Sequence, residues 1–163
     1  MRVLVVEADG GSRGNPGPAG YGALVRDGAT GEVLAERAGF LGVATNNVAE
    51  YRGLIAGLRA AREIDPRAYI DVRLDSRLLV HQMKGEWKVK HPDMKALHAE
   101  ARKIVRDLHV TFAWAPRAEN TSADALANEA MDAEAVSIRR GLGAEDAGAG
   151  NAGCSDGGGH ALF

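Results

Sequence analysis

The stretch DGGSRGNPGPAGYG, from Asp9 to Gly22, decides how the rest of the chain is interpreted. It follows a short apolar run, residues 3–6, that is typical of a buried first strand. A carboxylate therefore comes where that strand ends, and a turn rich in glycine and proline follows. Glycines let another backbone or a ligand come close, and prolines stiffen the chain. The pattern predicts a rigid loop beside a lone acid rather than a plain hairpin.

The segments that follow alternate between strand and helix patterns. Strands are predicted at 21–26 and 33–41, and together with the first strand they form an antiparallel meander. The remaining predicted elements are a helix at about 45–65, a strand at 69–74, helices at 76–83 and 93–108, a strand at 109–114 and a helix at 121–136. A meander followed by such units implies an α/β fold with a five-stranded mixed sheet, in which the last two strands run parallel to the first. Helices are expected on both faces of the sheet.

Length and composition indicate one folded domain followed by a segment that does not fold. We expect a folded domain at 1–138 and a Gly/Ala-rich disordered tail or linker at 139–163. No apolar run approaches the roughly 20 residues that span a bilayer, so no membrane association is expected. The only cysteine, Cys154, cannot form an internal disulfide, which favours a reducing, cytoplasmic location. Net charge is −2, but basic residues outnumber acidic ones between Arg77 and Arg106. That local excess is typical of a surface that binds nucleic acid.

Four carboxylates stand at the ends of predicted elements. Asp9 and Asp75 each close a strand, and Glu50 and Asp124 lie near the starts of helices. If the two strands are adjacent and parallel, all four acids can meet at one edge of the sheet. Acids so close repel one another unless cations neutralise them, and oxygen-only ligation suits Mg²⁺ or Mn²⁺. Two such ions form a common device for displacement at phosphorus.

Each acid also has an ordinary structural interpretation. Glu50 and Asp124 stand three residues after Asn47 and Thr121, as capping-box partners do. Asp75 could simply begin a helix, and the acid of the opening stretch could be a turn residue. Caps are common, so each of these interpretations is an alternative for its own acid. They do not explain why all four acids should meet at the glycine-rich stretch.

Three further motifs follow the opening stretch in order: TNNVAEY (45–51), LDSRLLVHQM (74–83) and ENTSADALANEA (119–130). Together the four motifs resemble type 1 ribonuclease H over about residues 1–131, which implies a ribonuclease H-like fold. The resemblance implies that Asp9, Glu50, Asp75 and Asp124 are the catalytic residues. These acids would bind two Mg²⁺ ions, or Mn²⁺, with substrate present. The implied reaction is attack of water on the RNA strand of an RNA–DNA hybrid, which leaves 5′-phosphate and 3′-hydroxyl ends.

The same resemblance implies which residues read the hybrid. Asn15 and the backbone at 11–13 match the part that contacts RNA 2′-hydroxyls, and Asn46 and Asn47 match side chains at the minor groove. Thr45 matches a residue that binds a DNA-strand phosphate at a helix N-terminus. Plain helix capping is the alternative interpretation for Thr45, Asn46 and Asn47. The predicted substrate contacts are Gly11, Ser12, Arg13, Asn15, Thr45, Asn46, Asn47, Arg77, Trp87, Arg117 and Asn120.

The aromatic and basic residues leave two interpretations open. Trp87 matches an aromatic that packs against DNA sugars, and a half-buried core position is the alternative. Trp114 is expected in the core. The lysines nearby would contact phosphates or, alternatively, form a solvated helix face: Lys84, Lys88, Lys90 and Lys95.

The sequence departs from the family pattern in the loop before the last helix, in a shortened basic segment at 85–93 and after the Asp-Ser pair. Many members carry a histidine in the loop that here reads APRAEN (115–120), where Arg117 cannot shuttle a proton near neutral pH. Arg77 replaces the more usual glutamine after the Asp-Ser pair. The tail is similar to that of members in which a phosphatase-like domain follows, so such a domain is a possible partner, and a monomer is expected. Two other functions stay open: a non-catalytic hybrid-binding module and a DNA-directed nuclease of the same fold.

Overall fold

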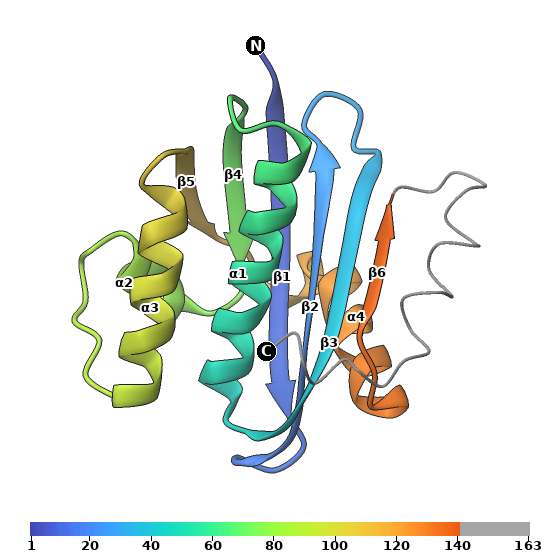
Figure 1. The fold of residues 1–163 in the computed structure, drawn as a ribbon, viewed down its shortest axis with the longest axis vertical. Coiled ribbons are helices and arrows are strands. Elements are labelled where there is room, and N and C mark those ends of the chain that lie inside the picture. The colour runs from blue at the N-terminus through green and yellow to red at the C-terminus, as the bar shows by residue number, and fades with distance from the viewer. Residues whose placement is uncertain (141–163) are drawn as a thin grey trace.

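A computed structural model describes residues 1–140, which are organised around one six-stranded sheet of order β5-β4-β1-β2-β3-β6 (Figure 1). The strands are β1 (Val3–Ser12), β2 (Gly17–Asp27), β3 (Val33–Ala44), β4 (Tyr69–Leu74), β5 (His109–Trp114) and β6 (Ser137–Arg140). The helices are α1 (Asn46–Ile64), α2 (Arg77–Met83), α3 (Pro92–Val105), the short 3₁₀ turn η1 (Arg117–Glu119) and α4 (Thr121–Ala133). Most of the predicted tail, with Cys154, lies outside the described residues.

The strand pairing confirms the predicted mixed sheet. β1, β2 and β3 form an antiparallel meander, and β4 runs parallel to β1, with Leu4 opposite Ile70 and Ala8 opposite Leu74. β5 in turn runs parallel to β4. The parallel pairing follows from α1, because a helical crossover returns the chain in the same direction as before.

Most of the opening stretch forms a β-hairpin, so the prediction of a rigid loop was wrong. β1 continues to Ser12 and β2 begins at Gly17, which leaves only residues 13–16 as the turn. Gly10 and Gly22 allow helices to pack closely on the two strands. A Cβ at Gly10 would lie 2.2 Å from the carbonyl carbon of Ala49, and one at Gly22 would lie 2.3 Å from the carbonyl oxygen of Ala123.

The sheet has one strand more than the five predicted. Helix α4 ends at Ala133, and Glu134 adopts a left-handed conformation (φ 51°) that turns the chain back. β6 then pairs antiparallel with β3 and carries the sheet through Arg140, past the predicted boundary at 138. Four residues rich in polar side chains carry no strand signal of their own. The pairing depends on tertiary contacts, among them an ion pair of Arg139 with Glu36.

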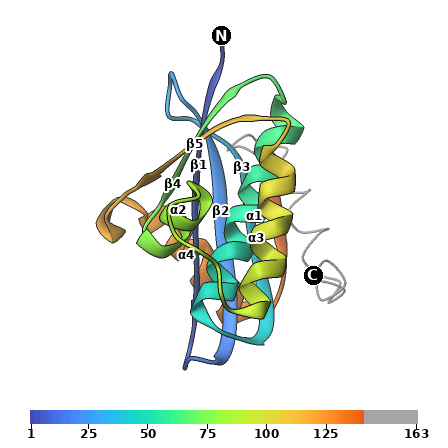
Figure 2. The same ribbon diagram turned by 90° about the vertical axis from the view of Figure 1, so that its left-hand side faces the viewer.

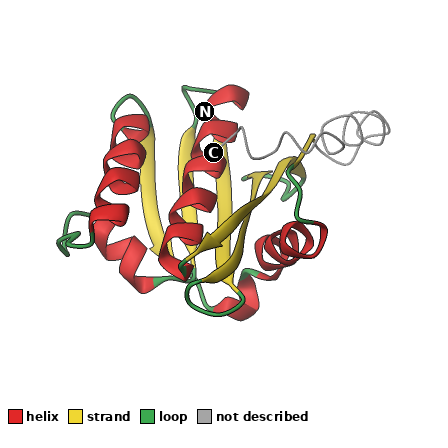
Figure 3. Cartoon of the chain, turned by 60° about the horizontal axis from the view of Figure 1, so that its bottom comes forward, coloured by secondary structure: helices red, strands yellow, loops and turns green. Residues whose placement is uncertain are grey.

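Helices cover both faces of the sheet, as predicted (Figures 2 and 3). α1 and α3 pack on one face over a core that includes Leu4, Val6, Tyr51, Leu54 and Leu58, all fully buried. Burial of each such side chain contributes about 1.5–3 kcal/mol. α4 packs on the other face over a smaller cluster: Leu24, Val33, Ala38, Ala123, Leu126 and Ala130. No helix among residues 1–140 is long and apolar enough to cross a bilayer.

Candidate active site

The parallel pairing of β1 with β4 places the first two acids side by side. β1 continues to Ser12, so the prediction that Asp9 closes the first strand was wrong. Ala8 lies opposite Leu74 in the β1–β4 pair, and Asp9 and Asp75 are the next residues on the two strands. Both carboxylates therefore reach the same end of the sheet, as the sequence predicted. Asp9 is only 4% exposed, although it is an acid. Burial of an unpaired charge costs free energy, so the arrangement calls for a compensating cation.

Helix α1 brings the third acid to this point. Gly53 lets α1 touch β1, since a Cβ there would lie 2.7 Å from the carbonyl oxygen of Asp9. Thr45 is the N-cap residue, and its hydroxyl accepts a hydrogen bond from the backbone N–H of Val48 (3.3 Å). Glu50 lies beyond the first turn, so its interpretation as a capping partner was wrong. The capping alternative is confirmed for Thr45 itself.

Three acids form a tight cluster that fits a hard divalent cation. One carboxylate oxygen each from Asp9, Glu50 and Asp75 lies within 4.8 Å of the others. Oδ1 of Asp9 and Oδ2 of Asp75 are buried without a hydrogen-bond partner. Oxygen donors left unsatisfied at one point are what Mg²⁺ or Mn²⁺ would require.

Burial and mutual repulsion perturb the proton affinity of this cluster. Burial, and then the charge of Asp75, raises the pKa of Asp9 to about 7. Burial, and then the charges of Asp75 and Asp9, raises the pKa of Glu50 to about 8. Burial also raises the pKa of Asp75, while the Arg117 guanidinium works against that rise. Such raised pKa values are typical of a functional site, and a bound cation would offset the repulsion between these carboxylates.

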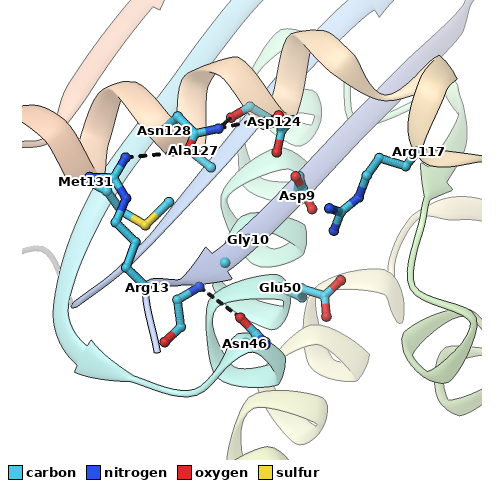
Figure 4. Close-up of a pocket in the computed structure, with 12 residues that line it drawn as sticks. Asp9, Gly10, Arg13, Asn46, Glu50, Arg117, Asp124, Ala127, Asn128 and Met131 are labelled. Atoms are coloured by element: carbon cyan, nitrogen blue, oxygen red, sulfur yellow. Dashed lines mark hydrogen bonds between the residues drawn. The ribbon is translucent and has the colours of Figure 1, made fainter. Parts of the chain in front are cut away.

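Asp124 faces the cluster from the first turn of α4 (Figure 4). Its carboxylate contributes to the raised pKa of Asp9, and it lines the same pocket. Asn128, one turn further along α4, donates from Nδ2 to the backbone oxygen and Oδ2 of Asp124 (3.1 and 3.4 Å). Asn128 was not among the predicted site residues, although its spacing of four residues from Asp124 on a predicted helix was a signal for it. Thr121 is the first residue of α4, and no capping box forms there.

Asn120 joins the acid-bearing elements rather than facing the substrate. It is 1% exposed, and its Nδ2 donates to the backbone oxygen of Ala8 (2.9 Å). This bond ties β1, at the residue before Asp9, to the start of α4. Burial contradicts the predicted direct contact with substrate, and Asn120 instead holds Asp9 and Asp124 in their relative positions.

Arg117 reaches toward the acids from η1 (Figure 4). Its side chain is 80% exposed, and Nε lies 3.7 Å from Oδ2 of Asp75. The guanidinium is close enough to offset part of the negative charge, but too exposed and too distant to neutralise the cluster. A phosphate entering the pocket would meet this positive charge at its rim.

The pocket extends from the acids along the tip of the β1–β2 hairpin. The backbone N–H of Ser12 donates to Oδ1 of Asn46 (2.8 Å), and the N–H of Asn46 donates to Oδ1 of Asn15 (3.1 Å). These bonds lock the hairpin to the start of α1. The pocket is lined by Asp9, Gly10, Gly11, Ser12, Arg13, Asn46, Glu50, Arg117, Asp124, Ala127, Asn128 and Met131.

Apart from the buried Asn120, the predicted contacts that do not line this pocket are Asn15, Thr45, Asn47, Arg77 and Trp87. Trp87, between α2 and α3, is 48% exposed, and its ring stacks on His81 with 4.1 Å between ring centroids. The core alternative for Trp87 was therefore wrong. The expected core position of Trp114 was also wrong, because β5 is an edge strand and the side chain is 41% exposed.

Comparison with known proteins places the chain among ribonucleases H. A family model described as "Reverse transcriptase-like" matches residues 7–130. "Bifunctional protein Rv2228c" of Mycobacterium tuberculosis is 55% identical over 135 residues, which cover 82% of this chain. The chain spans only 37% of the length of that relative. "Ribonuclease H" of Hydrogenovibrio crunogenus is 33% identical over 150 residues, and the match covers 81% of this chain and 97% of that protein.

Solved structures agree with these matches. The N-terminal RNase H domain of Rv2228c from Mycobacterium tuberculosis superposes with a TM-score of 0.78 at 54% identity, covering 82% of this chain and 96% of that one. LC11-RNase H1 in complex with an RNA/DNA hybrid gives a TM-score of 0.74 at 39% identity, covering 79% and 96%. The acid cluster, the sheet order and the match over 97% of the Hydrogenovibrio crunogenus protein agree, so the chain belongs to the ribonuclease H family.

Proposed function

We propose that this domain hydrolyses the RNA strand of RNA–DNA hybrids and leaves 5′-phosphate and 3′-hydroxyl ends. The observation that carries the proposal is the convergence of Asp9, Glu50 and Asp75 within 4.8 Å, with Asp124 facing them. A non-catalytic binding module would have no need for buried acids that repel one another. The hybrid named with the LC11-RNase H1 structure supports the choice of substrate.

Divalent cations fit the acid cluster. Asp9, Glu50 and Asp75 would hold them, with Asp124 completing the set when substrate is bound. Two Mg²⁺ or Mn²⁺ ions, when bound, supply an activated water and neutralise charge on the scissile phosphate. Oxygen-only ligation favours these ions over zinc, which prefers nitrogen and sulfur donors.

The neighbouring side chains position the acids and compensate charge. Asn120 fixes the end of β1 against α4, and Asn128 orients the Asp124 carboxylate. Arg117 places a permanent positive charge beside Asp75. Because a guanidinium keeps its proton near neutral pH, this loop supplies electrostatic stabilisation rather than a general acid. A proton for the leaving group would have to come from solvent.

Two surfaces flank the acids and would separate the strands of the hybrid. The RNA side is the hairpin tip, where backbone at 11–13, Asn15 and Asn46 are locked together and can meet 2′-hydroxyls. The DNA side would include the Thr45 hydroxyl at the N-terminus of α1 and the exposed ring of Trp87. Exposed lysines around that ring would contact phosphates: Lys84, Lys88, Lys90 and Lys95.

We also propose that the domain acts as a monomer in the cytoplasm and is compatible with a second, phosphatase-like domain. The name "bifunctional" of the Mycobacterium tuberculosis relative supports a second domain in proteins of this kind. Sedimentation of the purified chain at several concentrations tests the monomer, and a shift toward a dimer mass would contradict it.

Cleavage of end-labelled duplexes tests the proposed reaction. RNA–DNA, RNA–RNA and DNA–DNA duplexes of one sequence are incubated with Mg²⁺, Mn²⁺ or EDTA. We expect cuts only in the RNA strand of the hybrid, only with metal, and none with Asp75→Asn. Equal cleavage of duplex DNA would favour a DNA-directed nuclease, and hybrid binding without cleavage would favour a binding module.

A further inference from the structure

An exposed tryptophan is fixed directly beside a metal-binding acid. Trp114 ends β5, opposite Leu74, and its Nε1 donates to the backbone oxygen of Asp75 (3.2 Å). The ring is 41% exposed, so its outer face is open to a ligand or a side chain. A large apolar ring anchored this way provides a rigid surface next to the acid cluster.

The guanidinium of Arg77 lies on that surface. Its Cζ is 3.8 Å from the centroid of the Trp114 ring. Among residues 1–140, no hydrogen bond or ion pair holds the N–H groups of Arg77, whereas Arg13, Arg26 and Arg73 each pair with an acid. A cation–π contact orients the guanidinium plane and leaves its five N–H donors free to bind a ligand.

The free donors define the ligand. A guanidinium fork matches the paired oxygens of a phosphate, and an orientation set in advance reduces the entropy lost on binding. Asp75, two residues before Arg77, belongs to the cluster that would hold the scissile phosphate. A phosphate that neighbours the scissile one on the same strand is the anion that we expect Arg77 to meet while the cluster is occupied.

We propose that Arg77, held over the Trp114 ring, binds a phosphate of the RNA strand next to the scissile one. Trp114 is the positioning residue for this contact. The inference rests on the proposed hybrid cleavage. It adds to that function a phosphate contact made by the arginine after the Asp-Ser pair, which an aromatic ring holds in place. If Arg77 only shields the Trp114 ring from water, replacing Arg77 should change the salt dependence of cleavage no more than replacing any other exposed arginine.

The salt dependence of cleavage separates these two cases. kcat/KM for a labelled hybrid is measured in Mg²⁺ over a series of KCl concentrations for the parent, Arg77→Gln and Arg67→Gln. Arg67 is an exposed arginine in the α1–β4 connection, at the opposite end of β4 from Asp75, so it is a control of equal charge. We expect Arg77→Gln to flatten the slope of log kcat/KM against log salt by about one unit. We also expect KM to rise about fivefold at low salt, with kcat within about twofold of the parent.

The role of Trp114 is tested by a double-mutant cycle. Trp114→Leu removes the stack, and we expect it to flatten the salt slope as Arg77→Gln does, with no further loss in the double variant. Trp114→Phe keeps an aromatic face and should retain most of the parent slope. Circular dichroism melts confirm that each variant is folded at the assay temperature.

Each outcome decides between the proposals. If the parent cleaves the hybrid and Arg77→Gln keeps the slope of Arg67→Gln, the phosphate contact is wrong while the proposed function stands. If Arg77→Gln flattens the slope but Trp114→Leu does not, the positioning role of Trp114 is wrong. If the parent does not cleave the hybrid in either metal, the proposed function fails, and the contact fails with it.

Discussion

Two charged regions of this sheet are built in opposite ways. In the acid cluster, Asp9, Glu50 and Asp75 crowd together with Arg117 at the rim, and buried carboxylate oxygens lack partners. At the β3–β6 edge, Arg139 lies between Glu36 and Glu129 and pairs with both. The edge has the composition of a surface ion pair that adds slightly to stability. The cluster costs stability until a cation arrives, which indicates that it is retained for function.

Asp9→Asn should give the largest effect and break the cluster at its centre. We expect hybrid cleavage in Mg²⁺ to fall by at least about a hundredfold, because a ligand and its charge are lost. The metal-free variant should melt a few degrees higher than the parent at pH 8, since one repelling carboxylate is gone. Initial rates and thermal melts measure the two effects. Glu36→Gln is the matched control and should keep the parent rate, and an active Asp9→Asn enzyme would contradict the site.

The pH dependence of the stability of the metal-free protein shows whether the acids of the cluster repel one another or are paired with cationic side chains. The pKa of Asp9 is raised to about 7 and that of Glu50 to about 8, so the folded state binds protons that the unfolded state releases. Their contribution to stability is full below the ordinary carboxyl pKa of about 4 and is lost as pH rises through 7 and 8.

Thermal melts in EDTA from pH 5 to pH 9 measure this loss. We expect the melting temperature to fall across the range, and Mg²⁺ to raise it more at pH 8.5 than at pH 6, because metal binding displaces protons. A melting temperature that rises steadily with pH in EDTA would mean that the acids are paired within the chain.

Asn128→Ala tests how far the cluster depends on its supporting bonds. The variant removes the donor to Oδ2 of Asp124 and leaves all four acids in place. We expect kcat to fall about tenfold with KM nearly unchanged, because orientation rather than charge is lost. Asn151→Ala, outside the described residues, provides a control of the same chemistry. An unchanged kcat would show that Asp124 needs no support from Asn128.

Arg139→Gln should give the smallest effect and act on stability alone. We expect a loss of about 0.5–1 kcal/mol, or roughly 2–6 °C in melting temperature. Cleavage at 25 °C should keep the parent rate, since β6 lies at the far edge of the sheet from β4. A large loss of activity in a folded protein would instead couple the β3–β6 edge to the cluster.

The acid site could be predicted from the sequence because local strand and helix patterns determine where its acids lie. Asp9 and Asp75 follow paired residues of β1 and β4, and matching positions on adjacent parallel strands lie side by side. Contacts between residues far apart in the sequence could not be predicted in this way, because no local pattern indicates them. The bond from Asn120 to Ala8 and the pairing of β6 with β3 depend on how the finished elements pack. The glycine-rich hairpin was misjudged because glycine permits both a loop and close helix packing, and sequence alone does not separate these uses.

The contact of α1 with β1 through Gly10 and Gly53 has a consequence for ion size. Backbone atoms, rather than adjustable side chains, set the separation of the elements that carry Asp9 and Glu50. Mg²⁺ binds oxygen at about 2.0–2.1 Å and Ca²⁺ at about 2.3–2.6 Å. We expect that a single added methyl group at either glycine would wedge the helix outward and move the pocket toward the radius of the larger ion.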